Sequence, residues 1–131
     1  MAKIQFTEQE LREFHDLAKQ WGKIVCRRAF GEQGPGLDVD LTTMENVAVE
    51  AMRGLVAGTL EAATAQQTQQ LGSLAPCPAC QQSCVVGSEP REIIIRGGGT
   101  FLYNEPVCHC TRCRRDFFPS ASCSAAARME L

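Results

Sequence analysis

Apolar residues in the first quarter of the chain recur at the spacing of one face of an α-helix. Thr7 and Glu10 form a capping-box pair that is typical of a helix start. The apolar face of this helix is formed by residues three or four positions apart, most of which are large: Leu11, Phe14, Ala18, Trp21 and Val25. Leu17 and Ile24 lie beside these residues and widen the face. Glycines and a proline between residues 31 and 36 predict that this helix ends in a loop.

A second, longer helix is predicted to begin at another capping-box pair, Thr42 and Glu45. Its seam consists mostly of small side chains: Met44, Ala48, Ala51, Leu55, Gly58 and Ala62. Small residues allow two backbones to approach closely, and large residues on the first helix fill the space between them. The pattern therefore predicts an antiparallel helical hairpin over residues 1–71.

A further apolar stripe on the second helix lies away from this seam and comprises Val49, Met52, Val56 and Leu60. The stripe needs a partner, which is either the second part of the chain or a second copy of the protein. We expect it to mediate formation of a homodimer or contact with a partner protein.

Two CxxC sequences follow a short linker, at Cys77–Cys80 and at Cys110–Cys113. Between them, 92–95 and 100–103 are rich in residues that favour β-strands, and Gly97, Gly98 and Gly99 separate the two segments. This arrangement predicts a β-hairpin flanked by two cysteine turns. The whole chain is thus expected to have an α+β fold: a helical hairpin (1–71), a small four-cysteine zinc ribbon with an antiparallel β-hairpin (72–119), and a tail that is expected to be disordered (120–131).

The four cysteines Cys77, Cys80, Cys110 and Cys113 are predicted to bind one structural Zn²⁺ ion. A CxxC turn places two thiolates on one side of a tight loop, and two such turns supply a tetrahedral site with no open position for catalysis. A single CxxC could instead be a redox dithiol, but no βαβ pattern surrounds either one. The spare potential ligands are Cys84, Cys108 and His109, whereas Cys26 and Cys123 are interpreted as a helix-face thiol and a tail thiol.

Charge and composition narrow the function classes. The 131 residues carry a formal net charge of −2, so the whole molecule is not a strongly basic nucleic-acid-binding protein. Seven Lys and Arg stand against ten Asp and Glu up to Leu71, whereas six Arg stand against five acidic residues after it. No signal peptide, membrane span or set of catalytic side chains is recognisable, so we expect a cytoplasmic protein that is not an enzyme and has no small-molecule substrate.

Several features of the second half resemble the N-terminal region of ISKra-type insertion-sequence transposases. They are Cys77-Pro-Ala-Cys80, Arg91, Gly99, Cys110-Thr-Arg-Cys113 and Phe117-Phe-Pro119. The specific motifs lie in 77–119, and a helical segment before the ribbon is also similar. The family often has glycine after each CxxC, where this chain has Gln81 and Arg114. If those positions require a positive φ, each residue costs about 1–2 kcal/mol relative to glycine.

The resemblance implies a zinc-binding accessory module that acts on DNA ends or assembles a transposase. It also implies that the catalytic domain, an RNase H-like domain with three carboxylates, is missing from this sequence. The residues expected to contact DNA are Arg112, Arg114 and Arg115, with Arg91 and Arg96. The alternative is a zinc-ribbon adaptor that binds another protein through its acidic helical half and has no nucleic-acid role.

Overall fold

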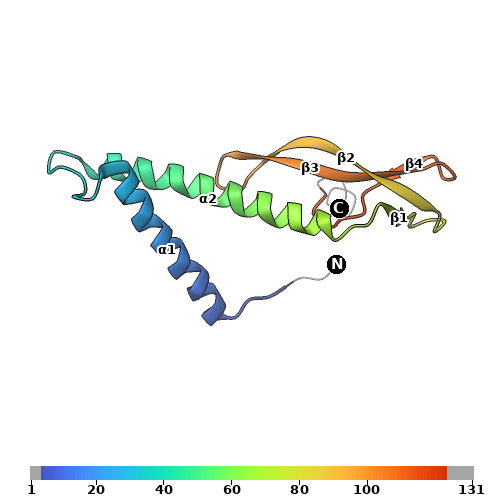
Figure 1. Cartoon of the computed structure of the whole chain (residues 1–131), viewed down its shortest axis with the longest axis horizontal. Helices are drawn as coiled ribbons and strands as arrows, with labels where there is room; N and C mark the ends of the chain where they lie inside the picture. Colours follow the sequence, from blue (N-terminus) through green and yellow to red (C-terminus); the bar gives the residue numbers. More distant parts are fainter. Residues whose placement is uncertain (1–3, 124–131) are drawn as a thin grey trace. The chain divides into compact units, whose positions relative to one another are not determined.

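The computed structural model of the chain describes residues 4–123, in which two helices precede four strands (Figure 1). In chain order the elements are α1 (Glu8–Phe30), α2 (Leu41–Gln69), β1 (Leu74–Pro76), β2 (Ser83–Ile94), β3 (Thr100–Cys110) and β4 (Arg115–Phe117). The strands form one antiparallel sheet in the order β1-β2-β3-β4. The predicted α+β class is confirmed. Neither of the two helices in this range is both long and apolar enough to cross a bilayer.

Helix α1 begins as the sequence predicts, whereas α2 does not. The Thr7 hydroxyl accepts the backbone N–H of Glu10, and the Glu10 carboxylate accepts the N–H of Thr7, which completes the capping box. At α2, the backbone N–H of Thr43 donates to Asp40 Oδ1 at 2.8 Å. The predicted capping by Thr42 is therefore wrong, because the Asp40 carboxylate satisfies the N-terminal amide instead. The Thr43 hydroxyl donates to the same oxygen at 2.6 Å, and this bond, together with the backbone bond, lowers the pKa of Asp40.

Helix α1 and the first half of α2 enclose no buried core between them. They meet at the loop that joins them, and α1 diverges from the first half of α2 beyond it (Figure 1). Neither α1 nor α2 contains a buried residue. Four members of the predicted α2 seam, Met44, Ala48, Ala51 and Leu55, line a groove against α1. The other two, Gly58 and Ala62, lie further along α2 and do not line it.

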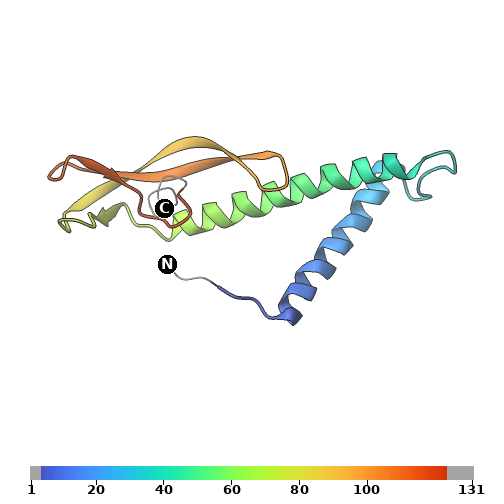
Figure 2. The same cartoon turned by 180° about the vertical axis from the view of Figure 1, so that it is seen from behind.

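The chain divides into two compact units, 1–55 and 56–131, and the division falls inside α2. The boundary predicted at residue 71 lies sixteen residues after the end of the first unit at Leu55. In the second unit, the end of α2 packs on the β2–β3 hairpin, which can be followed in Figures 1 and 2. Val56, Ala57 and Leu60 contact the buried side chains of Ile95, Phe101 and Tyr103. The C-terminal half of α2 is thus part of the ribbon's own core.

The β2–β3 hairpin is longer than the sequence indicates and buries both of its faces in turn. Its register is continuous from Ile94↔Thr100 to Val86↔Cys108. Near the glycine turn, Phe101, Tyr103 and Glu105 are buried; nearer the cysteines, Cys108 and Cys110 are buried instead. Because successive side chains alternate between faces, the buried face changes from the odd-numbered to the even-numbered side along β3. The hairpin therefore joins two separate cores.

The turn of this hairpin uses three glycines because all three residues have a positive φ: 90° at Gly97, 99° at Gly98 and 91° at Gly99. The backbone N–H of Ile95 donates to the carbonyl of Gly99 at 3.0 Å and closes the turn. The hairpin turn predicted from the triple glycine is thus present in the structure.

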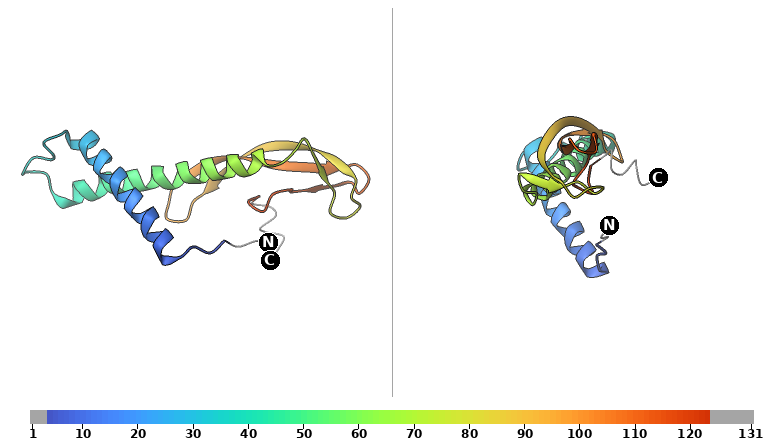
Figure 3. Two further views of the ribbon diagram at one scale, coloured as in Figure 1. Left: turned by 60° about the horizontal axis from the view of Figure 1, so that its bottom comes forward. Right: turned by 90° about the vertical axis from the view of Figure 1, so that its right-hand side faces the viewer.

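The segment after β4 returns along the hairpin (Figure 3). Tyr103 Oη and Ser122 Oγ lie 2.7 Å apart, and the Ser120 hydroxyl donates to Gln67 Oε1 at 2.9 Å. Cys123 is fully buried and its thiol donates to the carbonyl of Pro106 at 3.4 Å. Residues 120–123 of the predicted tail form no helix or strand, but the side chains of Ser120, Ser122 and Cys123 complete the core beside Tyr103. The rest of the predicted tail, 124–131, lies outside the described residues.

Candidate metal centre

The first cysteine turn joins β1 to β2 and is held by backbone hydrogen bonds. The N–H of Gln81 donates to the carbonyl of Cys77 at 2.8 Å, and the N–H of Cys77 donates to the carbonyl of Gln82 at 2.9 Å. The backbone N–H groups of Cys80 and Ala79 donate to the Cys77 sulfur and lower the pKa of that thiol. The turn thus favours a thiolate at its first cysteine.

The second cysteine turn joins β3 to β4 in the same way. Cys110 pairs with Arg115 across the base of the turn, and the N–H of Cys113 donates to Cys110 Sγ at 3.4 Å. This hydrogen bond is the main cause that lowers the pKa of Cys110 to about 6. The Gln82 amide lies 3.4 Å from Thr111 Oγ1 and connects the two turns through their side chains.

Both turns end in a residue with left-handed backbone conformation. Gln81 has a φ of 65° and Arg114 a φ of 56°. They are the only two non-glycine residues with positive φ within 4–123. The positive φ that the family's glycines suggested is therefore present at both positions. Each residue adopts a conformation that is unfavourable for a side chain with a Cβ atom.

The four sulfur atoms converge at a spacing that fits a tetrahedral metal ion. Cys77 and Cys113 have their sulfurs 3.9 Å apart, and Cys80 and Cys110 have theirs 3.6 Å apart. All four ligand atoms lie within 4.8 Å of one another. Zinc–sulfur bonds of about 2.3 Å in a tetrahedron require sulfur–sulfur separations of about 3.8 Å. The distances are far longer than the ~2.05 Å of a disulfide, so the geometry suits one four-coordinate ion.

The charge balance of the cluster also favours a bound cation. Cys110 has a lowered pKa, whereas hydrogen bonding to the Cys80 thiol and burial raise the pKa of Cys113 to about 12. Thiols this close cannot all ionise by themselves because the thiolates repel one another. A divalent ion compensates the negative charge and permits all four thiolates. The predicted set of four cysteines is the one that the structure brings together.

The remaining cysteines and His109 play other parts. Cys84 and Cys108 are buried in the core next to the cluster, and burial raises the pKa of Cys84 to about 11. Such thiols behave as small apolar core residues. His109 Nδ1 lies 2.7 Å from Asp116 Oδ1 on the neighbouring strand and is not part of the four-sulfur group. Cys26 is exposed on α1, as predicted, whereas the tail thiol Cys123 is buried.

The five predicted DNA-contacting arginines fall into three groups. Arg112, Arg114 and Arg115 are exposed on or beside the second cysteine turn. Arg96 is exposed at the opposite end of the hairpin, because the eight residue steps from Val86 to Ile94 span roughly 26 Å. The five residues therefore do not form a single surface.

Arg91 makes intramolecular ion pairs, so the prediction that it contacts DNA is not supported. Its Nε atom lies 3.3 Å from Oε1 of Glu105, whose side chain has 0% exposure, and its Nη2 atom lies 3.6 Å from Glu89. A buried carboxylate requires a compensating cation, which Arg91 supplies. The sequence contained no local signal for this pair, because the two residues are brought together only by the hairpin register.

The predicted dimerisation stripe is divided by the structure. Val56 and Leu60 pack on Phe101 and Tyr103 within the chain, whereas their part in a dimer stays a prediction. Met52 lines the groove against α1, and Val49 is exposed. Of the two partners considered for the stripe, the second part of the chain is the one that contacts Val56 and Leu60.

Comparisons of this chain with protein-family models, curated proteins and solved structures gave no match. The class that the fold and cluster define is an α+β protein with a zinc-ribbon-like four-cysteine site.

Proposed function

We propose that this chain is a zinc-ribbon module in which one Zn²⁺ ion fixes an arginine-bearing turn that contacts nucleic-acid phosphates. Four thiolates close the coordination sphere of the ion, so its role is structural rather than catalytic. The resemblance to ISKra-type transposases favours a DNA-end-binding or assembly role that leaves the cutting of DNA to another domain.

The exposed arginine group on the second turn is the observation that carries this proposal. Within 4–123, Arg112, Arg114 and Arg115 have no acidic partner at ion-pairing distance, in contrast to Arg91. The nearest acid in sequence, Asp116, pairs with His109 instead. Guanidinium groups form planar, bidentate hydrogen bonds with phosphate oxygens, and three on one rigid turn could reach neighbouring phosphates.

A salt titration of binding to duplex DNA tests the proposal. Three phosphate contacts predict that log affinity falls against log salt concentration with a slope of roughly −2.7, from about 0.9 per contact. Changing Arg112 and Arg115 to Ala and Arg114 to Gly should abolish most of this slope without releasing zinc. Glycine is used at 114 because it accepts the positive φ of that position.

A charge-matched control removes three cations from α1, by changing Arg12, Lys19 and Lys23 to Ala. This control should retain the wild-type slope. Equal losses in both variants would mean that only net charge matters. Absence of duplex binding by the wild-type protein at low salt would refute the phosphate-contact proposal.

The second candidate function is a protein-interaction adaptor with no nucleic-acid role. It is favoured by the exposed apolar side chains of α1, among them Phe14, Leu17 and Trp21. The zinc ion would then only stabilise the ribbon. Elemental analysis of protein purified without added metal tests the part common to both candidates, and should give one zinc per chain.

A further inference from the structure

Helix α1 presents a continuous apolar surface that the other described residues of its own unit, 4–55, leave exposed. Five large side chains on it are 49–55% exposed: Leu11, Phe14, Leu17, Trp21 and Ile24. Phe6, which precedes the helix, adds to this surface by an edge-to-face contact with Phe14 at 5.2 Å between ring centroids. An exposed apolar strip of this size marks an interaction site, because water contact with so many large side chains is unfavourable.

The charges of α1 are separated along the helix. Its first ten residues, 8–17, carry four acids and one base, a net charge of −3 with His15 neutral. The remaining residues, 18–30, carry four bases and no acid, a net charge of +4. The acids are Glu8, Glu10, Glu13 and Asp16, the base among them is Arg12, and the later bases are Lys19, Lys23, Arg27 and Arg28. This separation makes the helix complementary to a reversed copy of itself.

The apolar surface itself ends in opposite charges. Glu10 lies seven residues before Leu17, and Arg28 lies seven residues after Trp21. A separation of seven residues is about two helical turns, so these charges continue the apolar face at its two ends. In an antiparallel pair, Glu10 of each copy lies near Arg28 of the other. In a parallel pair, like charges would meet at both ends.

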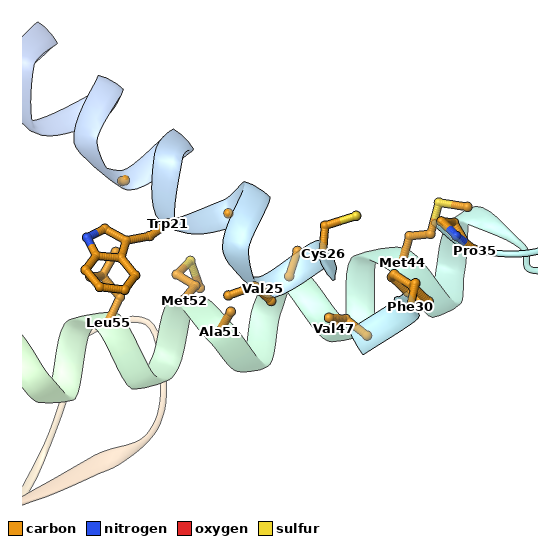
Figure 4. Close-up of a pocket in the computed structure, with 13 residues that line it drawn as sticks. Trp21, Val25, Cys26, Phe30, Pro35, Met44, Val47, Ala51, Met52 and Leu55 are labelled. Carbon is orange, nitrogen blue, oxygen red and sulfur yellow. The ribbon is translucent and has the colours of Figure 1, made fainter. Parts of the chain in front are cut away.

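A groove beside this surface offers room for the second copy. Trp21 and Val25 of α1 lie opposite Met52 and Leu55 of α2, and the groove between them has a volume of about 410 Å³ (Figure 4). All of its lining residues belong to 1–55. An antiparallel copy of α1 would lay its Leu11 and Phe14 beside this end of the helix and cover the groove.

We propose that α1 pairs antiparallel with α1 of a second copy of the chain and forms a symmetric homodimer. The 23 residues of α1 extend about 35 Å. Pairing along that length covers an area on the order of 800 Å² per chain, the amount found in stable interfaces. This dimer surface is on α1, whereas the stripe predicted from the sequence was on α2. The inference does not depend on the zinc ion or on phosphate binding.

The test uses two charge-reversed forms of the full chain. The basic form carries Glu10→Lys and Glu13→Lys, and the acidic form carries Arg27→Glu and Arg28→Glu. Sedimentation equilibrium of the wild-type protein should give twice the 14.3 kDa chain mass at high concentration. The dimer dissociation constant of each reversed form alone should be at least roughly tenfold higher than that of the wild-type protein, because like charges then meet at both ends of the helix pair. An equimolar mixture should recover wild-type association as a heterodimer.

The mixture guards against a trivial explanation. Glu10 also belongs to the capping box, so its loss could weaken the helix by itself. Restored association in the mixture excludes that explanation, because the cap stays broken in the basic chain. A matched control, Lys19→Glu with Lys23→Glu, has the same charge change as the acidic form. Each of these lysines lies two residues from Trp21 and thus on the opposite face, so the control should associate much more strongly than the acidic form.

Three results would overturn the proposal. The first is a wild-type monomer at all concentrations, which would leave the α1 surface to a different protein. The second is undiminished self-association of both reversed forms, as expected for a parallel or α2-mediated dimer. The third is failure of the mixture to associate although circular dichroism shows both forms to be helical.

Discussion

Replacing Gln81 and Arg114 by glycine should tighten zinc binding, because both residues hold a backbone conformation that suits glycine. Their φ angles are 65° and 56°, and both side chains are exposed. Within 4–123, neither the Gln81 amide nor the Arg114 guanidinium makes a hydrogen bond or ion pair with another residue. The substitutions therefore remove local strain and lose almost no packing.

The magnitude follows from two opposing terms. Left-handed conformation costs a residue with a Cβ atom about 1–2 kcal/mol relative to glycine. Glycine in turn loses more backbone entropy on folding, which costs about 0.5–1 kcal/mol. The net gain is about 0.5–1 kcal/mol per site, or about 1–2 kcal/mol for the double variant. Because metal binding and folding of the turns are coupled, this gain should lower the zinc dissociation constant about 5- to 30-fold.

Competition with a chromophoric chelator at constant pH measures that dissociation constant directly. Arg112→Gly serves as the matched control, since Arg112 is exposed on the same turn and has no positive φ. The control should weaken zinc binding slightly through its entropy cost. Gln81→Ala should bring little gain, because alanine keeps the Cβ atom. The reasoning is refuted if Gln81→Gly weakens zinc binding or if Gln81→Ala improves it as much as glycine does.

Three further tests probe the metal site, the packing of α2 and the C-terminal segment. Cys80→Ser should abolish zinc binding and Cys26→Ser should leave one zinc per chain, as elemental analysis of the purified variants would show; zinc retained by the first variant would contradict the four-sulfur site. Val56→Asp should lower the free energy of unfolding by about 2–4 kcal/mol, because it buries a carboxylate against Phe101 and Tyr103; an unchanged denaturation midpoint would contradict the helix–sheet packing. Tyr103→Phe should cost about 1 kcal/mol in the same assay through loss of the contact to Ser122, and no change would argue against that contact.

The sequence predicted those features that depend on residues close together in the chain. The capping box of α1, the two CxxC turns and the triple-glycine turn each occupy a few residues with strong conformational preferences. The identity of the helix cap at α2 was harder, because Asp40, Thr42 and Thr43 are all residues whose side chains can cap a helix. In the structure the Asp40 carboxylate caps the helix, because it accepts hydrogen bonds from both the backbone N–H and the hydroxyl of Thr43.

Features that depend on distant residues could not be predicted. The sequence pattern predicted shorter strands than β2 and β3, because these strands contain Pro90 and Pro106 and proline usually interrupts a strand. Here Pro106 pairs with Ser88, in a part of the hairpin where β3 has a single neighbouring strand. The ion pair of Arg91 with Glu105 results from the register of the β2–β3 hairpin. The spacing of polar and apolar residues along the sequence does not predict it. Residues 120–123 had no pattern of their own because their order comes from Tyr103 and Gln67.

The two cores of the ribbon imply that a metal ion held by the four cysteines would stabilise only one end of the hairpin. The core around Cys84, Cys108 and Cys110 consists largely of cysteines and contains the four sulfurs, so it has little apolar packing to replace the ion. The other core contains Phe101 and Tyr103 and is covered by α2. Chelation should therefore remove hydrogen-exchange protection from 75–86 and 106–117 while 93–103 retains part of its protection. Simultaneous loss along the whole hairpin would show instead that the two cores unfold as one cooperative unit. Partial retention would explain why a chain with such loosely packed helices keeps a continuous α2, because the hairpin would secure the end of that helix independently of the metal.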